Sequence, residues 1–189
     1  MSTPLVLFAV LLLGTGAMRL VELAVSVRRM RSRGERAVVA EPALFPLMAL
    51  LHTLLVFAPL AEVWLLARPF VPAAAALSAG ILVAATALRV WTLSTIGVAW
   101  NVRVVRPEDG TVVTTGPYAW IRHPNYLAVI LEIAGLPLFH GAWLSLVGLS
   151  LLNGLVLAIR IPTEERMLAE LPAWREAMAD RARLVPGVF

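Results

Sequence analysis

The chain has 189 residues, of which 60% are hydrophobic and only 15% are charged, and its mean hydropathy is +0.83. A soluble domain carries about 25% charged residues, so this composition excludes a soluble globular protein and predicts one membrane domain over residues 1–189. All 16 basic side chains are arginine, the net charge is +4 and cysteine is absent, which excludes disulfides, zinc-thiolate sites and thiol nucleophiles.

Five apolar segments are predicted to cross a membrane, because a helix needs ~20 residues to span the hydrocarbon core. The fourth segment is short, and it is predicted to form a helical hairpin with the fifth that turns at His140-Gly141. The expected fold class is all-α, a polytopic membrane bundle of five transmembrane helices. The segments cover residues 5–27, 43–67, 71–96, 125–139 and 142–161.

The arginines flank these segments and form no single stripe, which favours membrane topology over nucleic-acid binding. The second connection holds only Arg68, and the N-terminus holds none. Cytoplasmic loops collect positive charge, so we expect the N-terminus outside and the C-terminus in the cytoplasm. The basic regions contain Arg28, Arg29, Arg31, Arg33 and Arg36, then Arg103, Arg106 and Arg122, and finally Arg166, Arg175, Arg181 and Arg183.

The tail after the fifth segment alternates charged residues with apolar residues at helical spacing. This pattern predicts an amphipathic helix that lies on the cytoplasmic face of the membrane. Pro162 and Pro172 are expected to kink or break it. The apolar positions are Met167, Leu168, Leu171, Trp174 and Met178.

Several ionisable side chains lie inside the predicted spans, where such groups usually face the bundle interior or water. Arg19 and Glu22 are three residues apart and are expected to pair on one helix face. Arg89 lies in the cytoplasmic half of its span, so we expect it to contact substrate or cofactor. Glu62, towards the outer side, is expected to be structural. The remaining interior groups are His52 and Glu132.

The segment 116–126 reads GPYAWIRHPNY and directly precedes the fourth span. Pro124 suits a first helical turn, whose free N–H groups can receive a carboxylate, and Arg122 can pair with the same carboxylate. An interfacial belt of Trp, Tyr and Arg is the alternative. A belt does not require His-Pro-Asn-Tyr, so a binding site is favoured. Aromatic faces for a cation or an adenine are offered by Tyr118, Trp120 and Tyr126.

Two adjacent carboxylates, Glu164 and Glu165, follow the fifth span, and Arg160 lies just inside it. One carboxylate is expected to bind a ligand cation or hydroxyls, and the other to support Arg160 or Arg122. The alternative is a solvated first turn of the tail helix. The connection before Tyr126 is longer than usual, which favours a functional loop that includes Asn101 and covers the cofactor.

Residues 116–126, 159–165 and 185–186 resemble the isoprenylcysteine carboxyl methyltransferase family in order and spacing. The resemblance implies a helical membrane enzyme that uses S-adenosylmethionine, releases S-adenosylhomocysteine and binds it in a cytosolic pocket within residues 97–189. It also implies a lipophilic acceptor that enters from the bilayer, and membrane lipids that surround the protein. Arg160 would lie near the reacting group, and the cofactor would be held by His123, Pro124, Tyr126 and Glu164 or Glu165.

Residues 19–22 and 31–34 and Leu51-His52 resemble small bacterial members of this family that are associated with type III polyketide synthases. This resemblance implies a bacterial inner-membrane protein and favours a long-chain alkylpyrone or alkylresorcinol as the acceptor, with a prenylcysteine carboxylate next. A phenol titrates near 10, so a resorcinol hydroxyl would need a base, either His123 or a glutamate.

Two other classes of function stay open. Membrane steroid-reductase-like proteins also use His-Pro-Asn-Tyr and bind NADPH, but they typically place Gly-Glu soon after the Tyr, where this chain has Leu127-Ala128-Val129. A small membrane scaffold or transporter would place polar groups along a midplane pathway, whereas here they gather at one rim. We expect no metal site and no nucleic-acid partner.

Overall fold

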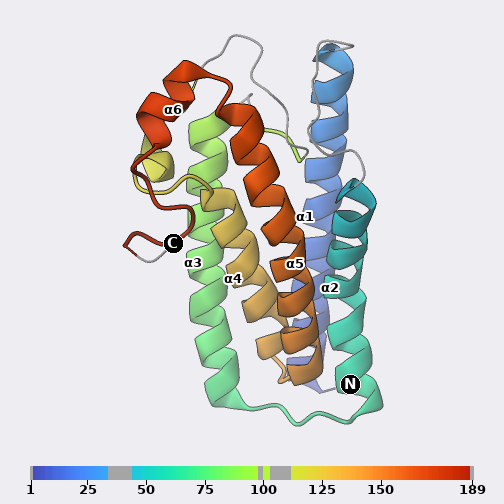
Figure 1. Cartoon of the computed structure of the whole chain (residues 1–189). Coiled ribbons are helices and arrows are strands. Elements are labelled where there is room, and N and C mark those ends of the chain that lie inside the picture. The colour runs from blue at the N-terminus through green and yellow to red at the C-terminus, as the bar shows by residue number, and fades with distance from the viewer. Residues whose placement is uncertain (1, 34–43, 98–99, 103–111, 188–189) are drawn as a thin grey trace.

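A computed structural model of the chain describes residues 2–33, 44–97, 100–102 and 112–187. In these residues the secondary structure is helical without strands, and the long helices lie side by side as a bundle (Figure 1). The predicted all-α class is confirmed. The elements are α1 (Thr3–Arg33), α2 (Phe45–Leu65), α3 (Pro72–Ile96), η4 (Gly116–Ala119), α4 (Pro124–Leu138), α5 (Trp143–Leu168) and α6 (Pro172–Met178).

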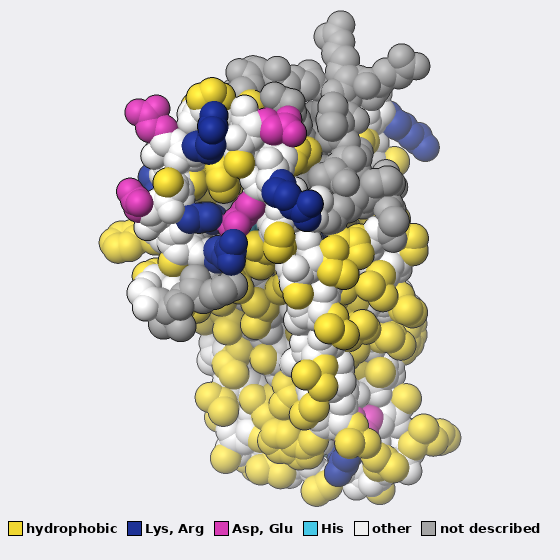
Figure 2. Space-filling view, viewed as in Figure 1, with side chains coloured by type: hydrophobic (Ala, Val, Ile, Leu, Met, Phe, Trp, Pro, Cys, Tyr) yellow, Lys and Arg dark blue, Asp and Glu magenta, His cyan; other side chains and the backbone are white. Residues whose placement is uncertain are grey.

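Among the described residues, four helices are long and apolar enough to cross a membrane: α1, α2, α3 and α5. Their flanks expose large hydrophobic side chains such as Trp64, at 76%, and Val83, at 71% (Figure 2). A soluble monomer rarely exposes a continuous surface of this kind, so the chain is an integral membrane protein. The fourth predicted span corresponds to α4, a shorter apolar helix of 15 residues that is largely buried. The prediction of five spans is therefore confirmed for four of them.

The largest differences from the sequence prediction concern α1 and α5. Helix α1 continues to Arg33, and α5 continues through Pro162 to Leu168. The predicted break at Pro162 is wrong, and Pro59 and Pro137 also lie inside helices. Helices in membranes tolerate proline because neighbouring groups satisfy the freed carbonyl. As a consequence, the two tail carboxylates belong to the last turns of α5.

The core holds α4 against its neighbours by close packing. Apolar side chains of α1, α2, α4 and α5 form one buried cluster that includes Phe8, Leu55 and Ile133. On the α3 side, a side chain on Gly135 would come within 2.8 Å of Leu82, so glycine is what permits the close approach. The predicted turn at His140-Gly141 is confirmed, and Gly141 has a φ of +69°, which favours glycine.

Charged side chains gather at the end of the bundle where α6 lies, which we call the α6 end (Figure 2). The opposite end, where the chain passes from α2 to α3, is the α2–α3 end (Figure 1). Helix α6 begins at Pro172, and its apolar face packs inside the protein, where Trp174 and Met178 contact Val112 and Tyr118. The location of this tail on a cytoplasmic membrane surface stays a prediction. Arg36, Arg103 and Arg106 lie outside the described residues.

Candidate functional site

The segment before α4 and the C-terminal tail run beside each other at the α6 end. The backbone N–H of Arg122 donates to the carbonyl of Ala182 at 2.9 Å, and that of His123 donates to the carbonyl of Arg183 at 3.0 Å. Ile121 and Ala182 form a parallel bridge. Backbone hydrogen bonds therefore join two segments that are about 60 residues apart in the sequence. Together the two segments form one local structure at the start of α4.

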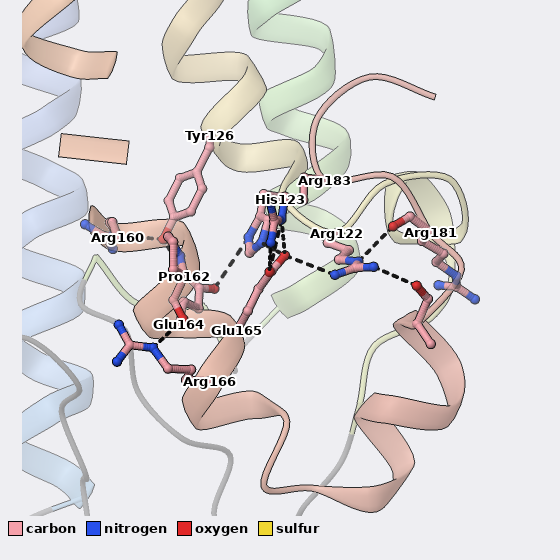
Figure 3. A network of polar contacts seen from close by, with 11 residues as sticks. Arg122, His123, Tyr126, Arg160, Pro162, Glu164, Glu165, Arg166, Arg181 and Arg183 are labelled. Carbon is pink, nitrogen blue, oxygen red and sulfur yellow. Dashed lines mark hydrogen bonds and ion pairs between the residues drawn. The ribbon is translucent and has the colours of Figure 1, made fainter. Parts of the chain in front are cut away.

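Two arginine side chains strengthen this contact, one from the segment before α4 to the tail and one from the tail to that segment (Figure 3). The guanidinium of Arg122 donates to the carbonyls of Arg181, at 2.8 Å, and Ala179, at 2.7 Å. Arg181 in turn donates to the carbonyls of Thr114, at 3.3 Å, and Tyr118. In this structure Arg122 holds the tail, so its predicted pairing with a cofactor carboxylate stays a prediction.

Glu165 is a buried hub that links three elements, with 9% of the residue exposed. Its carboxylate accepts from Arg122 Nη1 at 3.2 Å, from His123 Nε2 at 3.2 Å and from Arg183 Nη2 at 3.0 Å. A carboxylate only accepts, so His123 Nε2 carries a proton. The hydrogen-bonding capacity of Glu165 is taken up by the protein itself, which gives it a supporting role, as the sequence predicted for one of the two glutamates.

Glu164 is different because its carboxylate is only partly satisfied. One oxygen accepts from the Tyr126 hydroxyl, and the other lies 3.9 Å from His123 Nδ1, beyond hydrogen-bond range. Its side chain is 22% exposed.

The Tyr118 phenol is affected by the same carboxylate. Burial raises the pKa of the Tyr118 phenol well above its usual range, and the charge of Glu164 raises it further. Glu164 is thus an available anion among aromatic rings.

Tyr126 and Arg160 connect this charged cluster with the interior of the bundle. Arg160 Nε donates to the Tyr126 hydroxyl at 2.6 Å, and its guanidinium lies 5.2 Å from the centre of that ring. The ring also stacks on His123, with centroids 5.2 Å apart. Arg160 further donates to the Val102 carbonyl at 2.6 Å and contacts the sulfur of Met48. Four parts of the chain therefore meet at Arg160.

Residues 100–102, near the start of the long loop, contact α1. Ser26 donates to Asn101 Oδ1 at 2.6 Å, and the Val102 N–H donates back to Ser26 at 3.2 Å. Arg29 donates to the Trp100 carbonyl at 2.8 Å. Asn101 therefore stands on the α1 side of the site. Its predicted role in covering the cofactor stays a prediction, and residues 103–111 of this loop lie outside the described residues.

A cavity of about 550 Å³ lies among the helices next to the Tyr126–Arg160 pair. Volumes of this size are typical of small-molecule sites. Arg89 lines it, paired with Glu22 at 2.5 Å and donating to Asn125 at 3.3 Å. The cavity wall is otherwise mostly apolar and comes largely from α1 and α2, with Leu13, Leu20, Val56 and Phe57 as examples.

A charged network beside the cavity includes most of the interior groups that the sequence analysis singled out. The predicted pairing of Arg19 with Glu22 is confirmed at 2.7 Å, and Arg19 also pairs with Glu132. Because Glu22 binds Arg89 as well, the network joins α1, α3 and α4. Paired charges of this kind are how ionisable groups are accommodated in a membrane interior.

The structure brings the two predicted motifs together. His123 and Tyr126, at the start of α4, contact Glu165 and Glu164, near the end of α5, and Pro124 is the first residue of α4. Tyr118 instead packs against α6. The sequence analysis did not identify Arg183 as an ion-pair partner of Glu165. Its position in a basic tail was the feature of the sequence that pointed to it. Arg181 was missed for the same reason.

Comparisons with known proteins show what this chain is similar to. Residues 78–170, which contain both motifs, match the isoprenylcysteine carboxyl methyltransferase (ICMT) family. The uncharacterized protein YpbQ of Bacillus subtilis (strain 168) is 32% identical over 127 residues, which are 67% of this chain and 74% of that protein. An uncharacterized protein of Haemophilus influenzae is 28% identical over 163 residues, 82% of this chain and 91% of the relative. The cobalt-zinc-cadmium resistance protein CzcN of Cupriavidus metallidurans is 34% identical over 103 residues, 52% of this chain and 44% of that protein.

Proposed function

The chain belongs to the isoprenylcysteine carboxyl methyltransferase family and is a membrane methyltransferase, and from this premise we propose that it transfers a methyl group from S-adenosylmethionine to an oxygen of a lipophilic acceptor. The observation that carries the proposal is the Tyr126–Arg160 pair, which touches the charged cluster on one side and lines the apolar cavity on the other. A water-soluble donor and a lipid-soluble acceptor can meet at such a junction.

The cluster at the α6 end has groups that suit the amino-acid part of the donor. Glu164 is partly exposed, and among the described residues only the Tyr126 hydroxyl donates a hydrogen bond to its carboxylate, which therefore suits an ammonium. The start of α4 has no side-chain cap at His123 and suits a carboxylate. When bound, the cofactor supplies an electrophilic methyl group on a sulfonium. Glu165 holds His123 and Arg122 in place rather than contacting the donor.

The cavity suits the acceptor. Its apolar wall fits an alkyl or prenyl chain, and its volume of about 550 Å³ fits a small lipid. A long-chain alkylpyrone or alkylresorcinol is the favoured acceptor, and a prenylcysteine carboxylate comes next. Holding both reactants in line accounts for most of the rate, because alignment can be worth ~7–11 kcal/mol. The arginine distribution supports an N-terminus outside the bacterial inner membrane and a cytoplasmic site.

Calorimetry of the detergent-purified protein with S-adenosylhomocysteine and, separately, with NADPH tests this proposal. We expect S-adenosylhomocysteine to bind and NADPH not to bind. Binding of NADPH alone would overturn the proposal in favour of a reductase, and binding of neither would favour a scaffold or transporter. Transfer of labelled methyl from S-adenosylmethionine to a resorcinol with a long alkyl chain, followed in the same preparation, then tests the acceptor.

A further inference from the structure

His52, on α2, is part of the cavity lining and keeps one ring nitrogen without a hydrogen-bond partner among the described residues. Its Nδ1 lies 2.8 Å from the Met48 carbonyl oxygen, one turn away on α2. Because a carbonyl only accepts hydrogen bonds, Nδ1 carries the ring proton and Nε2 has the free lone pair. Among the described residues Nε2 has no hydrogen-bond partner, and His52 is part of the cavity lining. A side chain that can accept a hydrogen bond and act as a base therefore belongs to the wall of the space in which the lipid is proposed to lie.

The cations of the cavity wall, by contrast, are already paired. Arg89 donates to both oxygens of Glu22 and to Asn125. Arg160 donates to the Tyr126 hydroxyl and the Val102 carbonyl. A carboxylate in this cavity would displace an existing pair to gain a cation. A hydroxyl would instead donate to the open nitrogen of His52 without disturbing any pair.

Arg19 is the remaining cation of the lining, and it too is engaged. Its two terminal nitrogens bind Glu22 and Glu132. Its Nε has no hydrogen-bond partner in the part of the chain that the structure describes, but this atom is buried. Among the described residues of the lining, the cations are paired and His52 keeps an open ring nitrogen, an arrangement suited to an acceptor that brings its own proton.

The position of His52 relates it to the proposed reaction centre. Met48 contacts Arg160, so His52 stands one helical turn from the Tyr126–Arg160 pair. His52 and Arg160 therefore line the same cavity, next to the junction to which the methyl group is proposed to come.

We propose that His52 is a catalytic base and that the acceptor is a lipid with a phenolic or enolic hydroxyl, an inference that rests on the proposed function. His52 Nε2 takes the hydroxyl proton while the acceptor oxygen forms a bond to the methyl carbon. The bond from this carbon to sulfur breaks, and its electron pair stays on sulfur. The products are a methyl ether and a neutral thioether, and the imidazolium near Glu22 returns its proton to water. A phenol with a pKa of about 10 needs such a base near neutral pH.

The test compares the wild-type protein with His52→Gln, which keeps a hydrogen-bond acceptor but is not a base, and with His52→Asn. The first readout is methyl transfer to a long-chain alkylresorcinol. We expect kcat to fall about 100-fold or more in both variants, within the range for loss of a general base. Affinity for S-adenosylhomocysteine and the unfolding midpoint should stay unchanged, which separates a catalytic role from a folding defect.

The second readout needs no turnover. A nitrophenol with a long alkyl chain, bound together with S-adenosylhomocysteine, reports its ionisation by absorbance. We expect it to ionise in the wild-type cavity at a pH at which the same probe in empty detergent micelles stays neutral, and we expect neither His52 variant to show this.

Wild-type rates or wild-type nitrophenol spectra in the variants would overturn the role of His52. A wild-type protein that methylates N-acetyl-S-farnesylcysteine and not the alkylresorcinol would overturn the hydroxyl acceptor. A wild-type protein that fails to bind S-adenosylhomocysteine would instead overturn the proposed function, so the two failures are distinguishable.

Discussion

The two ends of the bundle both contain buried carboxylates, but these differ in how much of their bonding capacity the protein uses. At the α2–α3 end, Glu62 accepts from the N–H groups of Leu144, at 3.1 Å, and Ser145, at 2.7 Å, and pairs with Arg68 at 3.0 Å. Its side chain is 5% exposed. It caps the start of α5 from a neighbouring helix, which fits the structural role predicted for it.

At the α6 end, two adjacent carboxylates divide these tasks. Glu165 resembles Glu62, because arginine and histidine side chains satisfy it. Glu164 has one firm partner, Tyr126, and keeps a partly exposed oxygen. A carboxylate whose hydrogen bonds are all made within the protein stabilises the fold, whereas one that can still accept hydrogen bonds can bind a ligand. Substitutions of the three carboxylates test this distinction.

The largest expected effect is on stability, from Glu165→Gln. The neutral amide would leave His123, Arg122 and Arg183 without their common anion in a buried site. Breaking a buried ion pair typically costs ~3–5 kcal/mol, so we expect a loss of this size in unfolding experiments in detergent. The control is Glu176→Gln on the exposed side of α6, which should change little. Equal stability of the two variants would contradict the hub role of Glu165.

A smaller loss is expected from Glu62→Gln. The first turn of α5 would lose a charged acceptor, and hydrogen bonds to charged groups contribute about 1.5–3 kcal/mol. Denaturant unfolding measures the loss, and calorimetry should show unchanged affinity for S-adenosylhomocysteine. Weaker binding of S-adenosylhomocysteine by this variant would contradict a purely structural role for Glu62, because it would show that a change at the α2–α3 end alters the site at the α6 end.

Glu164→Gln should show the reverse pattern. We expect its affinity for S-adenosylhomocysteine to fall about tenfold, equivalent to ~1.4 kcal/mol, because the ammonium loses its anion. Its stability should change by only about 0.5 kcal/mol, as is usual for partly exposed positions. Calorimetry and unfolding on the same sample measure both quantities. A large loss of stability with unchanged affinity would remove Glu164 from the binding site.

The smallest effect at neutral pH is expected from Tyr118→Phe. Burial and the charge of Glu164 raise the pKa of this phenol, so the folded protein keeps a proton that the unfolded chain loses above about pH 10. The contribution of Tyr118 to stability is therefore complete below that pH and declines as the pH rises further. Compared with the wild type, the variant should lose less stability in alkali. Parallel stability curves across this pH range would contradict it.

Much of this molecule follows from local sequence patterns. The apolar segments predict α2 and α3 closely, and Pro124 and Gly141 mark a helix start and a turn because of their own backbone preferences. The expected meeting of the segment 116–126 with residues 159–165 is also found, in the contacts of His123 and Tyr126 with the two glutamates.

What the sequence did not predict depends on tertiary context. Pro162 was expected to kink or break the tail helix, but α5 continues through it to Leu168, as the helices of a membrane bundle can. Arg183 pairs with Glu165 only because the tail folds back along the start of α4, which no periodicity reveals. The open nitrogen of His52 becomes visible only once the Met48 carbonyl and the cavity are located.

The structure of the complex with S-adenosylhomocysteine, determined by experiment, tests the central claim most directly. We expect its amino group within hydrogen-bond distance of Glu164 and its sulfur beside Tyr126, facing the cavity that Arg160 and His52 line. A ligand bound at the α2–α3 end near Glu62, or one that contacts neither Glu164 nor Tyr126, would contradict the claim.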